Sequence, residues 1–243
     1  MKRETKLISV RDLFRQSWKL YRERIGLLTK IILLPVAFIV VGGLWGLLTS
    51  NGWFGGLLIF IGTIISVLSY LALVFALQKN TSFGESYRLV LGRIWSYGWL
   101  TVLSGFVTLG GIFMLVVPGI IFSIWFMFAI YVFAIEGDKG MNALLKSREY
   151  VRGYWWPVFG RQIVFVLAVL AVALVTSFIG SVLTGGDKAG SDIISDLLTL
   201  VVAPLIAAYL YVLYGSLKSL KPEVAKKPPQ GPQGFFYFSA VFG

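Results

Sequence analysis

The chain has 243 residues, of which 57% are hydrophobic and only 14% are charged. Soluble domains carry about 25% charged residues, so this composition excludes a water-exposed globular fold and indicates a membrane protein. Cysteine and histidine are both absent, which excludes disulfides, thiolate or imidazole metal sites, and the Ser-His-Asp, Cys-His and HExxH catalytic arrangements. We therefore expect neither enzymatic activity nor a cofactor or metal.

The chain begins with a charged, amphipathic segment. Apolar side chains recur in it every three or four residues, which predicts a helix with one apolar face, and Ser9 and Asp12 have the spacing of a capping box at its start. The apolar stretches Leu27–Leu48 and Phe54–Leu77 follow, each long enough to cross a bilayer as a helix. Residues 50–53 between them have the composition of a turn. We expect an interfacial helix followed by a hairpin of two spans.

A second amphipathic segment begins with the same capping pattern, at Ser82 and Glu85. Residues 99–135 then contain no charged side chain, and one helix of that length would reach about 55 Å, far more than a bilayer needs. Pro118 and Gly119 lie near the middle, where proline breaks the helical hydrogen bonds and glycine permits a turn. The stretch therefore predicts two spans joined by a tight turn. These spans are Trp99–Val117 and Gly119–Ile135.

A third amphipathic segment is less regular, because Arg148 interrupts its apolar stripe. Two more apolar stretches follow it, and the polar loop of residues 185–192 separates them. Residues 221–229 are rich in proline and lysine, which predicts an extended linker. A short aromatic segment follows, and its role stays open. The last two predicted spans are Ile163–Leu183 and Ile193–Leu213.

The basic residues indicate how these spans are oriented. The formal net charge is +11, from 22 Lys and Arg against 11 Asp and Glu. If both termini are cytoplasmic and there are six spans, 21 of the 22 basic residues fall in cytoplasmic segments and only Lys188 lies outside. Positive residues are retained on the cytoplasmic side of membranes. We therefore predict a multi-pass protein of the cell inner (plasma) membrane, and the charge does not call for a nucleic-acid partner.

The three amphipathic segments resemble one another in arrangement. Ser17, Ser86 and Ser147 align, and each segment is followed by a predicted hairpin. We interpret this as an internal three-fold repeat within one all-α membrane domain, an interfacial helix and a hairpin in each unit. The repeat units are residues 8–77, 82–135 and 138–217, the domain is residues 1–220, and the tail is residues 221–243.

Two interpretations of the amphipathic helices stay open. They are struts that position the hairpins, or they form a basic cytoplasmic collar that binds anionic lipid headgroups. The candidate lipid contacts under the second interpretation are Arg11, Arg15, Lys19, Arg22, Arg88, Arg93, Lys146 and Arg148.

One stretch carries a family resemblance. It combines a Pro-Gly turn, an acidic residue after the next span, an Ala-Leu-x-x-Ser helix and an Arg-Gly turn, within residues 117–153. This combination resembles the membrane domain of bacterial glycerophosphoryl diester phosphodiesterases. The resemblance implies a six-helix membrane module, without phosphodiesterase activity, which belongs to a separate soluble domain of that family. The motif positions, whose role the resemblance does not define, are Pro118, Gly119, Glu136, Ser147, Arg152 and Gly153.

These observations together predict a non-enzymatic membrane scaffold that interacts with lipids, anionic ones among them, or with a protein partner at its cytoplasmic face. A permease or lipid-translocating protein is the alternative, suggested by the paired spans and by Pro35 and Pro204 within them. An enzyme acting on membrane lipid ranks third, because only Glu136, Asp138 or Glu149 offers an acid or base.

Overall fold

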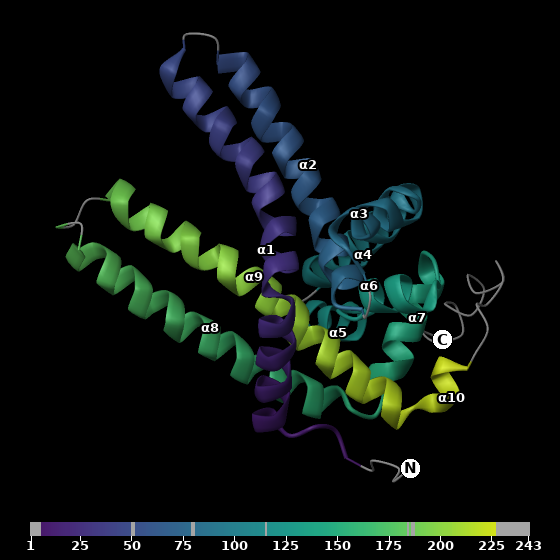
Figure 1. Cartoon of the computed structure of the whole chain (residues 1–243). Coiled ribbons are helices and arrows are strands. Elements are labelled where there is room, and N and C mark those ends of the chain that lie inside the picture. Colours follow the sequence, from purple (N-terminus) through teal and green to yellow (C-terminus); the bar gives the residue numbers. More distant parts are fainter. Residues whose placement is uncertain are drawn as a thin grey trace. The chain divides into compact units, whose positions relative to one another are not determined.

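A computed structural model describes residues 6–49, 52–78, 81–114, 116–183, 185 and 188–226, and the described residues are helical with no strand (Figure 1). The helices are α1 (Val10–Leu48), α2 (Gly52–Ala76), α3 (Phe83–Leu91), α4 (Ile94–Met114), α5 (Val116–Phe126), α6 (Ala129–Tyr131), the π-helix η1 (Val132–Glu136), α7 (Met141–Val151), α8 (Trp155–Leu183), α9 (Lys188–Leu220) and α10 (Pro222–Ala225).

Five of the described segments are long and apolar enough to cross a membrane. They give the chain the helices of a multi-pass membrane protein, as the composition predicts. The helix at the third predicted span, α4, is not one of the five, and part of it lies outside the described side chains. The five segments are Val10–Gly46, Gly52–Ala76, Val117–Glu136, Trp155–Leu183 and Val202–Leu220.

The helix boundaries differ from the predicted ones in three places. The first amphipathic segment is not a separate helix, because α1 continues unbroken from Val10 to Leu48. Gly26, which lies near the predicted boundary, lowers the helix propensity but does not end the helix. Near the predicted turn, α4 ends at Met114 and Pro118 lies in the first turn of α5, where a proline is tolerated. Residues 222–225 form the short helix α10 rather than an extended linker, and the aromatic tail lies outside the described residues.

Both predicted capping patterns are confirmed. The backbone N–H of Asp12 donates to the Ser9 hydroxyl over 3.1 Å, and that hydroxyl donates to the Asp12 carboxylate over 2.7 Å. The backbone N–H of Glu85 donates to Ser82 Oγ over 3.3 Å. The bonds from the backbone N–H groups of Asp12 and Glu85 each satisfy a donor that the first turn of a helix leaves without a partner.

The backbone packing divides the chain into two compact units. Unit 1 holds the described residues of Met1–Leu13, Val90–Gly160 and Leu210–Gly243, and unit 2 consists of Phe14–Leu89 and Arg161–Tyr209. The single domain and the three-fold repeat stay predictions. The aligned serines 17, 86 and 147 are each almost fully buried, at 1%, 0% and 0% exposure.

In unit 2, α1 and α2 run side by side in opposite directions (Figure 1). A Cβ atom added to Gly55 would lie 2.6 Å from the Gly42 carbonyl oxygen, and one added to Gly42 would lie 2.7 Å from that of Gly55. Because these contacts involve backbone, only glycine allows the helices to approach so closely. At the other end of the pair, the Arg24 guanidinium donates to the Ala76 carbonyl, a cation on the last carbonyls of α2.

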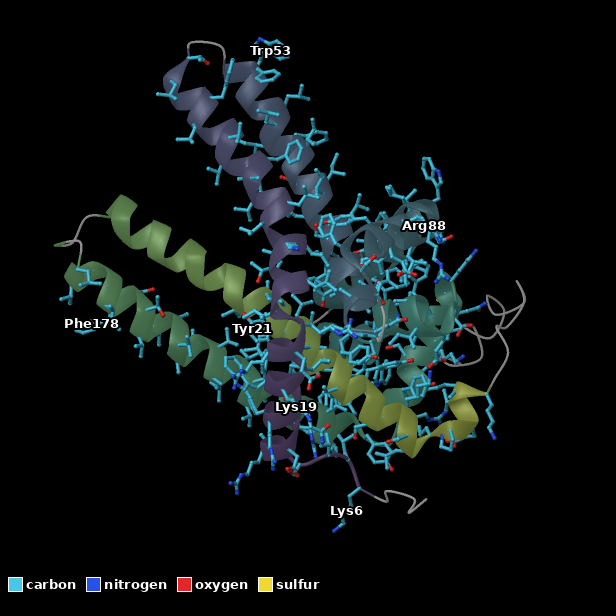
Figure 2. The ribbon with its side chains drawn as sticks, viewed as in Figure 1. Lys6, Lys19, Tyr21, Trp53, Arg88 and Phe178 are labelled. Atoms are coloured by element: carbon cyan, nitrogen blue, oxygen red, sulfur yellow. The ribbon has the colours of Figure 1, made fainter. Side chains whose placement is uncertain are left out.

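The second helix pair of unit 2, α8 with α9, is joined by aromatic contacts. The rings of Phe165 and Tyr209 stack with centroids 4.0 Å apart, and the Tyr209 hydroxyl donates to the Arg161 carbonyl over 2.7 Å. The rest of α8 exposes apolar side chains, such as Phe178 at 71% exposure, which points away from the helix in Figure 2. An apolar outer face of this kind suits contact with lipid tails.

Unit 1 is built around the broken segment α5–α6–η1, the short helix α7 and the carboxyl-terminal end of α9. Its core is rich in tyrosine: Tyr131 and Tyr214 stack at 5.9 Å, and Tyr150 meets the Tyr214 ring edge-on at 5.6 Å. Buried tyrosines need partners for their hydroxyl groups. Those partners lead to the charged residues of the candidate site.

Candidate functional site

A cluster of charged and phenolic side chains lies inside unit 1, and we call it the ion cluster. It forms where the π-helix η1 ends, a wide helical turn of a kind often found at functional sites. Gly137 (φ 81°) ends η1 and Gly140 (φ 52°) precedes α7, both in the left-handed region that favours glycine. The short link between these glycines holds an acidic residue inside the fold. The cluster consists of Glu136, Asp138, Lys146, Tyr150, Tyr214 and Lys218.

Glu136 is the acceptor at the centre of the cluster. Its Oε1 atom accepts hydrogen bonds from the hydroxyls of Tyr150, over 2.8 Å, and Tyr214, and lies 3.0 Å from Lys218 Nζ. Its Oε2 atom lies 2.8 Å from Lys146 Nζ. Oε1 therefore accepts hydrogen bonds, whereas Oε2 has an ion-pair partner, and the partners of both oxygens come from α7 and from the end of α9.

Lys146 joins the two carboxylates of the cluster. Its ammonium lies 2.8 Å from Glu136 Oε2 and 2.8 Å from Asp138 Oδ2. Only 5% of the Glu136 side chain, 2% of Asp138 and 10% of Lys146 is exposed, whereas Lys218 is 35% exposed. Two carboxylates face two ammonium groups, so the cluster is formally neutral. A buried charge requires such compensation, because removal from water is costly.

The environment shifts the proton affinities of two α7 residues in the cluster. Burial lowers the pKa of the Lys146 ammonium, but hydrogen bonds and attraction from Asp138 and Glu136 outweigh it, so this pKa lies above its usual value. Burial, together with the bond to the Glu136 carboxylate, raises the pKa of the Tyr150 hydroxyl. Lys146 stays charged and Tyr150 stays a donor at neutral pH.

This geometry corrects one predicted lipid contact and adds residues that were not predicted. Lys146 is turned inward onto two carboxylates, so it is not a headgroup contact. Tyr150, Tyr214 and Lys218 were missed as site residues, because nothing local connects α7 with the end of α9. The sequence signal that was available is Glu136 and Asp138, two acids that directly follow the uncharged stretch 99–135.

Three of the predicted motif positions lie in α7 or directly after it. The buried Ser147 hydroxyl donates to the Trp125 carbonyl over 2.7 Å. Arg152 is the exposed C-cap of α7, and Gly153 follows it at φ 84°, as in helix ends that terminate in a left-handed residue. In α5, Pro118 is half-buried and Gly119 is buried. Glu136 lies in the ion cluster, so four of the six motif positions have a structural explanation.

Lys221 gives the end of α7 a second cap. Its ammonium donates to the carbonyls of Glu149 and Arg152 and lies 5.7 Å from the centre of the Tyr154 ring. A cation at the carboxyl end of a helix compensates the unpaired carbonyls there. Burial of this ammonium lowers its pKa. The chain after α9 is thereby bound to α7.

The basic residues predicted as lipid contacts near the amino terminus are exposed. Arg11, Arg15, Lys19 and Arg22 follow one another at three- or four-residue spacing on α1, so they share one stripe. The opposite side is buried, with Leu13 and Ser17 at 0% and 1% exposure. Figure 2 shows Lys19 on α1, and its ammonium makes only a surface ion pair with Glu23 at 3.9 Å.

The remaining predicted contacts lie on α3, in the link between α3 and α4, and on α7. Arg88 is exposed and points away from α3 (Figure 2). Arg93 is half-buried and has an interaction partner. The Arg148 guanidinium lies over the Trp125 ring, 4.6 Å from its centre, and burial lowers its pKa. Arg88 therefore has the freest side chain of these three.

Three of the small polar residues inside the apolar helices bond to their own backbone. Thr63 and Thr176 donate to the carbonyls four residues earlier, of Ile59 and Val172, over 2.9 and 2.8 Å. Ser66 donates to the Gly62 carbonyl in the same way. Hydroxyls occupied like this serve the helix itself rather than a polar path across the membrane.

Among the described residues, no three acidic side chains come together as ligands of a metal ion would. Comparison with models of protein families, with curated proteins and with solved structures gave no match for this chain. The chemistry of the site therefore rests on its geometry: a neutral, internally bonded ion cluster in unit 1 and exposed basic side chains on α1.

Proposed function

We propose that this chain is a multi-pass membrane module without catalytic activity that binds anionic lipid headgroups through exposed basic residues of α1. One observation carries the proposal: the first turns of α1 bury one stripe of side chains while Arg11, Arg15, Lys19 and Arg22 stay exposed on another. An amphipathic helix with basic residues on its polar side suits the boundary between headgroups and water.

Aromatic residues beside the basic stripe support this placement. The Trp18 ring, 49% exposed, stacks on Tyr21 with centroids 5.5 Å apart. Tryptophan prefers the headgroup level, where its ring is half in the apolar region and its N–H reaches water. Arg15, Lys19 and Arg22 would then lie at the depth of lipid phosphates, where each contributes about 1 kcal/mol of attraction to an anionic surface.

The proposed topology has six spans in three hairpins, with both termini in the cytoplasm and the protein in the cell inner membrane. The five membrane-length helices support it, and α4, with 21 residues, supplies the sixth. The positions of 21 of the 22 basic residues support the orientation. The resemblance to the membrane domain of glycerophosphoryl diester phosphodiesterases agrees with such a module and stays a prediction.

The ion cluster favours this function over an enzyme. Glu136 and Asp138, the foremost acid or base candidates, are bonded to Lys146, Lys218 and tyrosine hydroxyls. A general base must reach a substrate proton, and these groups are enclosed. For the permease alternative, the self-bonded hydroxyls of Thr63 and Thr176 give no support to a polar path.

Lipid retention measured by native mass spectrometry tests the proposal. The purified protein is titrated with phosphatidylglycerol or with phosphatidylcholine, and compared with the variant Arg15→Gln/Lys19→Gln/Arg22→Gln. The matched control is Lys139→Gln/Arg152→Gln/Lys226→Gln, which removes three exposed charges elsewhere. We expect the first variant to lose up to about a hundredfold in affinity for phosphatidylglycerol, from about 3 kcal/mol, and the control to keep most of it.

Equal retention of the two lipids by the unaltered protein, or equal loss in both triple variants, would contradict the proposal. Uptake of a solute or flipping of a labelled lipid by reconstituted vesicles would instead favour the permease alternative. Recovery of one stoichiometric partner, lost with the first triple variant alone, would identify the same stripe as a protein interface.

A further inference from the structure

Pro35 lies inside α1 and is buried. Proline has no backbone N–H, so the carbonyl four residues earlier, that of Ile31, loses its donor within the helix. A backbone carbonyl left without a donor in an apolar region costs free energy, and a helix bends readily where one hydrogen bond is missing. Residues 31–35 are therefore the weak point of a helix of 39 residues.

A side chain from α3 supplies the missing donor. The Tyr87 hydroxyl donates to the Ile31 carbonyl over 3.2 Å, and the same hydroxyl lies 2.7 Å from Ser69 Oγ on α2. Because the Tyr87 hydrogen is directed to Ile31, the Ser69 hydroxyl donates to Tyr87. We call this chain of two bonds, from Ser69 through Tyr87 to Ile31, the Tyr87 bridge. It connects three helices of unit 2 at the position where α1 lacks one backbone hydrogen bond.

Packing against α2 holds the turn of α1 at Pro35 beside the Tyr87 bridge. A Cβ atom added to Gly62 would lie 3.1 Å from the Pro35 carbonyl oxygen and 2.7 Å from Ile39 Cγ1. Because Gly62 has no side chain, the turn of α1 that contains Pro35 can approach α2 closely. Ser69 lies two turns further along α2 on the same side as Gly62, and its side chain is 4% exposed. Ser69 and Ile31, at the two ends of the bridge, are buried, which limits the access of water to the carbonyl that Tyr87 serves.

The helix that carries Tyr87 is short. It has nine residues, begins with the Ser82 cap and exposes Arg88 next to Tyr87. Isolated helices of this length are marginal, so α3 depends on its contacts and can leave them at a lower cost than a long helix can. Burial raises the pKa of the Tyr87 hydroxyl, which keeps it a donor at neutral pH.

We propose that α1 has a hinge at Pro35 and that the Tyr87 bridge holds this hinge closed. When α3 leaves its place, the Ile31 carbonyl loses its donor and the second half of α1 becomes free to bend. The helix α3 is thus a conformational control element for α1. This inference does not depend on lipid binding, because it rests on the hydrogen bonds at Ile31.

Distances between two spin labels on α1 test the hinge. The chain has no native cysteine, so Thr29→Cys and Leu44→Cys place labels at exposed positions on either side of Pro35. These positions are about 22 Å apart along an ideal helix, within the range of pulsed dipolar spectroscopy. We expect one narrow distance distribution in the unaltered background and a clearly broader one with Tyr87→Phe. Tyr154→Phe, a phenol lost from unit 1, is the matched control and should stay narrow.

Restoring the helical donor provides the decisive comparison. Pro35→Ala returns an N–H to the Ile31 carbonyl, so the double variant Pro35→Ala/Tyr87→Phe should be as narrow as the unaltered protein. A distribution unchanged by Tyr87→Phe, or a double variant as broad as Tyr87→Phe alone, overturns the hinge. If Tyr87→Phe does not accumulate as folded protein, the double variant should accumulate, and failure of both would also overturn the proposal.

Discussion

Units 1 and 2 use charge in opposite ways. In unit 1 the carboxylates of Glu136 and Asp138 are enclosed with lysines, and their side chains are 5% and 2% exposed. In unit 2 the basic residues Arg15, Lys19 and Arg22 are exposed, and the helices approach one another through glycines instead. Buried charges fix which groups meet, whereas exposed charges remain available to a partner. The enclosed set is part of the structure of unit 1, and the exposed set is the one that we propose binds lipid headgroups.

The largest effect should come from breaking the ion cluster. Lys146→Met leaves Glu136 and Asp138 without their shared cation, and loss of one partner of a buried pair destabilises a protein by about 3–5 kcal/mol. The measurement is thermal unfolding in detergent, followed by circular dichroism. Lys139→Met removes the same charge from an exposed neighbour and should stay within about 0.5 kcal/mol of the unaltered protein. Equal destabilisation by the two variants would remove the distinction between the enclosed and exposed charges.

A smaller effect is expected from the glycine contacts of unit 2. The Cβ of Gly55→Ala would lie 2.6 Å from the Gly42 carbonyl oxygen, and backbone atoms must move to accommodate it. Overpacking of this kind costs about 1–3 kcal/mol. The next residue provides a control, since a Cβ on Gly56 meets nothing within 4 Å and Gly56→Ala should be neutral or slightly stabilising. The same unfolding measurement tests this prediction. A Gly55→Ala variant as stable as Gly56→Ala would show that the close approach of α1 and α2 does not stabilise unit 2.

The smallest effect is a pH dependence that belongs to the ion cluster. The pKa of Lys146 is raised on folding, so its stabilisation is fully present below about pH 10.5, the usual lysine value, and is lost as pH rises through the folded value. One proton corresponds to about 1.4 kcal/mol per pH unit. The stability difference between the unaltered protein and Lys146→Met should therefore shrink above that pH. A difference that stays constant from neutral to strongly alkaline pH would mean that Lys146 gains nothing from its carboxylates.

The sequence predicted the helical membrane character and both helix caps, because these depend on local composition and spacing. The predicted turn at Pro118 stays a prediction, because the residue between the end of α4 at Met114 and the start of α5 at Val116 lies outside the described residues. The boundary expected within α1 is absent, since a single glycine is too weak a signal to end a helix.

No local sequence pattern could predict the ion cluster. Its bond between Tyr214 and Glu136 joins residues 78 positions apart, and nothing in either neighbourhood indicates the other. Lys146 has the same appearance in the sequence as an exposed lysine, and only the fold shows that it faces two carboxylates. Tyr87 lies in the second amphipathic segment with the spacing of an apolar packing residue, whereas its hydroxyl matters because Pro35, 52 positions earlier, leaves a carbonyl without a donor.

The direction of the Glu136 carboxylate depends on the number of residues in the π-turn that carries it. A π-turn holds one more residue than an α-turn, so the turn is wide only while that residue is present. Within residues 132–135, exchanging one apolar residue for another leaves that count intact. Deleting any one of them would remove the residue that widens the turn, so the backbone that carries Glu136 would change although every residue of the ion cluster were still present. For this segment, length is under a stricter constraint than residue identity.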